Sequence, residues 1–108
     1  MKIAIAAVLF AVSFSAAAGK SCSDIVVEAG ILKTEHMVWG LKERPDLAAT
    51  MLKAYISVCE SGKKAIQAGV GPEIVMAFAE GHAAKEGTPE DMKPVIIKIS
   101  ELAIENAK

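Results

Sequence analysis

The sequence predicts an all-α fold, a small four-helix bundle (three to five helices) with one disulfide. Three observations lead to this prediction. Apolar residues recur at the three- and four-residue spacing of helices over residues 23–106. Proline and glycine residues divide that region into four segments of helical length. Only one short run, residues 95–99, is rich enough in β-branched residues to form a strand, and it has no second run to pair with.

The first 18 residues predict a cleaved secretory signal peptide. Lys2 precedes a continuous apolar stretch, and three alanines at positions 16–18 then form a small-residue cleavage site. The apolar stretch is roughly a dozen residues long, whereas a membrane-spanning helix needs about 20. We therefore expect cleavage before Gly19 and a single helical domain over residues 19–108 without a membrane span. The expected location is the periplasm, with the extracellular space as the alternative.

Two cysteines predict one disulfide. Cys22 and Cys59 are the only cysteines, and both lie in the part expected to be exported, where thiols are oxidised. If the first two helices formed a straight hairpin around Pro45, Cys22 would lie about 13 Å beyond the level of Cys59. Bridged cysteines have Cα atoms within about 7 Å. We therefore predict that Gly30 is a hinge, with a short helix before it and a longer one after it.

The first two helical segments are bounded by clear signals. The first runs from about Ser23 to Glu43, with a serine cap and an acidic residue near its start. It ends before Pro45, because the residue before a proline avoids the helical region. The second segment runs from Pro45 to about Ala68, where glycine residues form a natural C-cap.

The last two segments follow the same pattern. The third runs from Pro72 to about Lys85, and the fourth from Thr88 to about Asn106. Thr88, a proline and two acidic residues together form an N-terminal helix signal. Pro94 lacks a backbone donor, so this last helix either kinks at Pro94 or starts again there. The sequence leaves both alternatives open.

The composition argues against nucleic-acid binding and catalysis. Residues 19–108 carry a formal charge of −2 and three aromatic side chains, whereas nucleic-acid binders present basic surfaces and stacking rings. No CxxC, HExxH, GxSxG or SxxK motif is present. His36 and His82, the two histidines, lie in separate segments, each without the further ligands that a metal needs. We therefore expect no enzymatic activity, no metal and no cofactor.

A small exported helical domain of this kind is expected to act by binding a protein of the cell envelope, as an inhibitor, immunity or exclusion-type factor. Two runs hold more apolar residues than one helical stripe buries, so we take Met37, Trp39, Ile96 and Ile97 as candidate interface residues. Trp39 is the expected anchor, because tryptophan is enriched at interface hot spots; a core position is the alternative. The small residues of segment 78–84 would allow close helix approach within the monomer or in a homodimer.

Two other functions are compatible with the sequence. The stretch Ser21-Cys22-Ser23-Asp24-Ile25 and the single-disulfide helical design resemble periplasmic acid-stress chaperones. That resemblance implies a protein that exposes apolar surface at low pH. The cysteine spacing and the long C-terminal half differ from those chaperones, so no family is assigned. The other function is a carrier of a small ligand, which requires a sizeable apolar cavity between helices.

Overall fold

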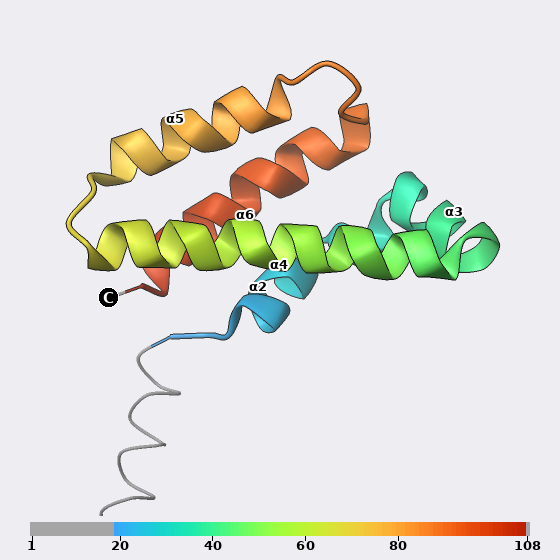
Figure 1. The fold of residues 1–108 in the computed structure, drawn as a ribbon, viewed down its shortest axis with the longest axis horizontal. Helices are drawn as coiled ribbons and strands as arrows, with labels where there is room; N and C mark the ends of the chain where they lie inside the picture. Colours follow the sequence, from blue (N-terminus) through green and yellow to red (C-terminus); the bar gives the residue numbers. More distant parts are fainter. Residues whose placement is uncertain (1–18, 108) are drawn as a thin grey trace, which may run out of the picture.

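The computed structural model describes residues 19–107, and within them the chain is entirely helical (Figure 1). The predicted all-α fold class is thus confirmed. The expected leader lies outside the described residues. Five α-helices and two short 3-10 helices follow one another: α2 (Cys22–Glu28), η1 (Ile31–Lys33), α3 (Glu35–Glu43), α4 (Pro45–Gln67), α5 (Pro72–Ala83), η2 (Glu90–Met92) and α6 (Lys93–Glu105). No helix of the described part combines the length and apolar content needed to cross a membrane.

Helix α6 is the central element of the fold. It packs against both α4 and α5, whereas α4 and α5 contact each other only sparsely. Helix α4 is the longest, with 23 residues, and α3 packs on its N-terminal part. Figure 1 shows α4 running along the length of the molecule, with α5 and α6 on one side of it. In this arrangement α4 and α5 both pack on α6 but lie apart from each other.

The core lies where α2, α4 and α6 meet. Helix α2 is short, yet its residues Ile25 and Val26 are 0% and 1% exposed. Helix α6 buries six of its residues, because it is covered from both sides. The largest fully buried side chains are Ile25, Val26, Ile31, Met37, Cys59, Met92, Ile96 and Ile99. Burial of these apolar side chains is the main source of stability.

A disulfide joins α2 to the middle of α4. The Cα atoms of Cys22 and Cys59 lie 5.7 Å apart, within the range of bridged cysteines, so the predicted pairing is confirmed. The first predicted helix, over 23–43, is divided in the structure into α2, η1 and α3. The division falls at Gly30, whose φ of +94° is in the left-handed region that favours glycine. The chain therefore turns at the position expected for the hinge.

Thr34, which follows this turn, is the N-cap residue of α3. Its hydroxyl accepts a hydrogen bond from the backbone N–H of Met37 at 3.2 Å and donates one to the carbonyl of Ile31 at 2.8 Å. The first contact caps α3, and the second ties η1 to that cap. Both hydrogen bonds are buried.

Replacing Gly30 with alanine is expected to destabilise the protein by about 1–2 kcal/mol, the cost of the left-handed conformation for a residue with a Cβ. No atom lies within 4 Å of the added Cβ, so the backbone alone sets this cost. Gly81→Ala is the matched control, because Gly81 is helical and its added Cβ also meets open space. That variant is expected to be more stable by up to about 1 kcal/mol. Urea unfolding measures both; equal stabilities would contradict the backbone argument.

The last helix begins later in the structure than the sequence predicts. Thr88 does not cap it: the Thr88 hydroxyl donates instead to the carbonyl of His82 at 3.4 Å, near the end of α5. Helix η2 intervenes, and α6 begins at Lys93 with Pro94 in its first turn. Proline is tolerated there because the N–H of a first-turn residue has no helical partner. The structure thus corresponds to a restart at Pro94 and not to a kinked helix.

Asp91 also has a role that the sequence did not indicate. Its carboxylate accepts hydrogen bonds from the backbone N–H groups of Glu35 at 2.7 Å and His36 at 3.4 Å. Asp91 therefore satisfies free donors at the N-terminus of α3 and places a negative charge at the positive end of that helix. This contact connects η2 to α3 across 56 residues of sequence.

Candidate binding groove

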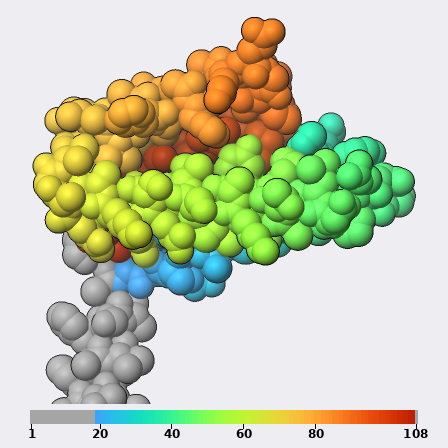
Figure 2. Space-filling view, in the orientation of Figure 1, coloured from blue at the N-terminus to red at the C-terminus, as the bar shows by residue number. Residues whose placement is uncertain are grey.

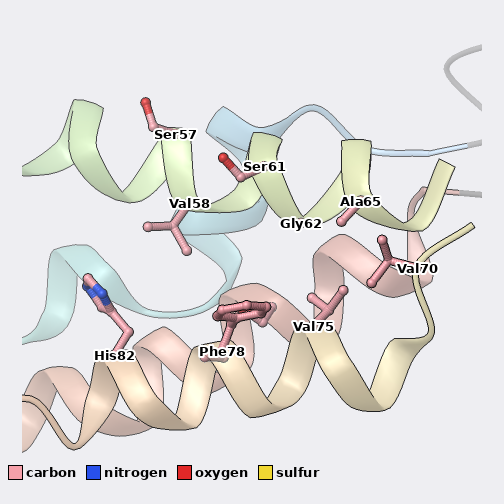
Figure 3. A pocket seen from close by; sticks show the side chains of 11 residues that line it. Ser57, Val58, Ser61, Gly62, Ala65, Val70, Val75, Phe78 and His82 are labelled. Carbon is pink, nitrogen blue, oxygen red and sulfur yellow. The ribbon is translucent and has the colours of Figure 1, made fainter. Parts of the chain in front are cut away.

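Helices α4 and α5 border an open groove whose floor is α6 (Figures 2 and 3). Its volume is about 500 Å³, within the range typical of ligand sites. Figure 2 shows atoms of α6 at the bottom of the hollow between α4 and α5. The lining residues come from α4, α5, α6 and the loop between α4 and α5: Ser57, Val58, Ser61, Gly62, Ala65, Val70, Val75, Phe78, Ala79, His82 and Ser100.

Small side chains on α4 account for the open space. Ser57, Ser61, Gly62 and Ala65 recur at helical spacing, so they share the side of α4 that faces the groove. At Gly62 the two helices are close: a Cβ there would lie 3.4 Å from the Cβ of Ala103 on α6. Helix α4 can therefore lie close to α6, and Val58 is its only lining side chain larger than serine.

Phe78 is the most exposed large apolar side chain among the described residues, at 77%. Figure 3 shows its ring on the side of α5 that faces α4. Helix α5 buries Val75, Ala79 and Ala83 against its neighbours, yet Ile74 on another side is also 48% exposed. A helix that is apolar on nearly all sides is usually covered in the functional state. Ile74 and Phe78 are four residues apart and share the exposed side of α5, which we call the apolar ridge; Phe78 lines the groove and Ile74 does not.

The polar groups of the groove are few. Ser57 and Ser61 lie on the α4 edge, His82 lines the groove from α5, and Ser100 belongs to the floor helix. His82 is the only ionisable side chain among the lining residues. The groove therefore offers apolar contact and hydroxyl groups, and it contains no carboxylate, lysine or arginine among the described residues that line it.

Two of the four predicted interface residues belong to the core, which corrects the expectation from sequence. Met37 is 1% exposed and Ile96 is 0% exposed, so neither is available to a partner. Met37 lies on the side of α3 that packs inward together with Gly40. Ile96 is buried because α6 is covered by α4 and α5 at once, and a helix covered twice buries more than one stripe.

The other two predicted interface residues remain accessible to different degrees. Trp39 is 49% exposed on α3, where Val38 and Leu41 are also exposed, and its ring centroid lies 6.3 Å from that of His36. Ile97 is half-buried on α6. Neither Trp39 nor Ile97 lines the groove.

Phe78 was not among the residues predicted for the site, although the composition of its helix carries a signal for it. Helix α5 carries only Glu73, Glu80 and His82 as polar residues, so its composition is that of a covered helix. The position of the groove itself had no sequence signal, because it depends on the separation of α4 from α5.

The perturbed ionisable groups lie away from the groove. Burial raises the pKa of Tyr55, the neighbouring Glu28 carboxylate raises the pKa of Lys20, and the Arg44 guanidinium lowers the pKa of Asp46. None of these three residues lines the groove. Within residues 19–107, no three histidine, cysteine or acidic side chains come close enough to hold a metal ion together.

No protein-family model, curated protein or solved structure matches this chain.

Proposed function

We propose that the protein acts by binding another protein of the cell envelope, as an inhibitor, immunity or exclusion-type factor, and that the apolar ridge beside the groove receives an amphipathic helix of that partner. The supporting observation is the 77% exposure of Phe78 next to an open apolar groove. Aromatic side chains, phenylalanine among them, are enriched in protein–protein interfaces relative to the rest of the surface.

The dimensions and the rim favour a helical partner segment. The α4 edge of the groove extends from Ser57 to Ala65, about 12 Å at 1.5 Å per residue, which is a little more than two helical turns. A helix laid along this edge would present apolar side chains at three- and four-residue spacing toward the groove. Glu60 and Lys64 are exposed on α4 between these lining positions and can pair with charges on the partner's polar edge.

Phe78→Ser is expected to reduce partner binding at least about 30-fold, the effect of removing a hot-spot side chain. Trp39→Ser is the matched control, because it removes an exposed aromatic from α3, outside the groove. The partner is first crosslinked and recovered from native envelope at neutral pH. Its amphipathic helix is then synthesised, and its Kd for each purified variant is measured by calorimetry.

Both substitutions are at exposed positions, so unchanged thermal unfolding is the check that each variant is folded. If Trp39→Ser abolishes binding and Phe78→Ser does not, the site lies on α3 and the groove proposal is wrong. If no partner is recovered at neutral pH and the protein suppresses client aggregation only at acid pH, the chaperone function replaces the proposed one.

A further inference from the structure

Ser100 is the one polar side chain deep in the groove. The residue is 4% exposed and lies on α6, which forms the floor of the groove between α4 and α5. The side-chain hydrogen bonds of α6 and its C-cap come from Lys93 and Asn106. The Ser100 hydroxyl makes none to any residue in the range 19–107.

Ser100 lines the groove, and its hydroxyl oxygen is not fully enclosed by protein. No fully enclosed side-chain oxygen or nitrogen lacks a hydrogen-bond partner in the described structure. Since the Ser100 oxygen has no protein partner, it is not fully enclosed, and the groove is the space that Ser100 lines. An apolar pocket with one inward polar group is the usual form of a small-molecule site, where the polar group fixes the orientation of the ligand.

We propose that the interior of the groove binds an uncharged, largely apolar small molecule whose single hydroxyl, ester or amide oxygen pairs with the Ser100 hydroxyl. This inference goes beyond the proposed function, because it concerns the floor of the groove at Ser100, whereas the partner helix would contact Phe78 and the α4 edge at the opening of the groove. The volume of about 500 Å³ is suited to such a molecule.

The lining residues favour a ligand without a charge inside the groove. His82 is the only ionisable lining residue, and the groove walls supply no arginine or lysine within the described chain. Burying a carboxylate or phosphate without an opposite charge is strongly unfavourable. A neutral hydrogen-bonding group avoids this cost and gives the Ser100 hydroxyl a partner that the protein does not provide.

Three probes with the same phenylbutyl body test the inference on the purified chain from residue 19: 4-phenylbutan-1-ol, butylbenzene and 4-phenylbutanoate. We expect the alcohol to bind and Ser100→Ala to weaken it about fivefold, the net contribution of one neutral hydrogen bond. The same substitution should leave the affinity for butylbenzene within twofold, because that probe has no polar group. The carboxylate should bind more weakly than the alcohol. Displacement of a fluorescent apolar dye reports all three affinities.

Ala65→Phe separates binding in the groove from binding elsewhere. Its ring should fill the groove and abolish dye displacement by the alcohol, whereas Ala68→Phe, at an exposed position outside the lining, should not. Equal effects of Ser100→Ala on the alcohol and on butylbenzene would overturn the role of Ser100. Unchanged binding in Ala65→Phe would overturn the site. If the chain sediments as a dimer that Phe78→Ser dissociates, and no probe binds, a second copy covers the groove and the proposal is wrong.

These results are independent of the partner experiment. Ser100→Ala leaves the exposed ridge of Ile74 and Phe78 intact, so it should not change the Kd of the partner helix. Failure of the probes therefore leaves the protein-binding proposal standing, and failure of partner recovery leaves the probe measurements valid.

Discussion

Replacing Cys22 and Cys59 together with alanine is expected to lower the free energy of unfolding by about 4 kcal/mol. The disulfide closes a loop with a sequence separation of 37 residues, and the loss of chain entropy in the unfolded state gives roughly this value. Small domains have a total stability of about 5–15 kcal/mol, so the change is a large fraction of the whole. Urea unfolding of the oxidised protein and the double variant measures it.

The loss should be concentrated in α2. This helix has seven residues, too few to be stable alone, and its disulfide to α4 holds it in the core through Ile25 and Val26. Both cysteines are buried, at 6% and 0% exposure. In the double variant, the backbone amides of α2 should exchange with solvent faster than those of α6.

Reduction of the wild-type protein is the control for the disulfide. Reduction and the double substitution open the same loop, so both should lower the free energy of unfolding by a similar amount. Only the double variant also removes the sulfur atoms, so agreement between the two assigns the loss to the opened loop. A double variant as stable as the oxidised protein would show that α2 is held by packing alone, and the entropic argument would be wrong for this fold.

Several features set by local sequence were predicted correctly. Helical spacing and proline–glycine punctuation are local signals, and they gave the all-α class and the starts of α4 at Pro45 and of α5 at Pro72. The start of the last helix was predicted wrongly, because Thr88 does not cap it and α6 begins at Lys93. The cysteine pairing followed from their number together with the expected compartment. The break before α3 followed from a distance argument: two cysteines in a straight hairpin would be too far apart, so the chain had to turn, and Gly30 was the residue best suited to a left-handed turn.

Features set by tertiary packing were not predictable in the same way. Ile96 and Ile97 are neighbours with the same side chain, yet one is fully buried and the other is half-buried, because α4 and α5 cover α6 from two directions. From the sequence, Asp91 was expected to be an acidic residue in the first turn of its own helix. In the structure its carboxylate accepts a hydrogen bond from the backbone of α3. The groove was likewise not predictable from the sequence. It exists because α4 and α5 pack on α6 but remain apart from each other.

Ile96→Ala is expected to cost about 2–5 kcal/mol of stability, the range for truncating a fully buried aliphatic side chain. Ile96 is 0% exposed in the N-terminal half of α6, so the cavity left behind has little freedom to collapse. Ile97→Ala is the matched control, one residue further along the same helix. It should cost roughly 1 kcal/mol, because that side chain is half-buried and its removal exposes less new surface.

The two variants also separate a core role from an interface role for this isoleucine pair. If Ile96 lies in the core, Ile96→Ala lowers the midpoint of urea unfolding but leaves the Kd of the partner helix unchanged at temperatures where the variant is folded. An interface residue would show the reverse, weaker binding with unchanged stability. Equal midpoints for Ile96→Ala and Ile97→Ala would mean that α6 is not covered from both sides in solution, and the groove above it would then lack its floor.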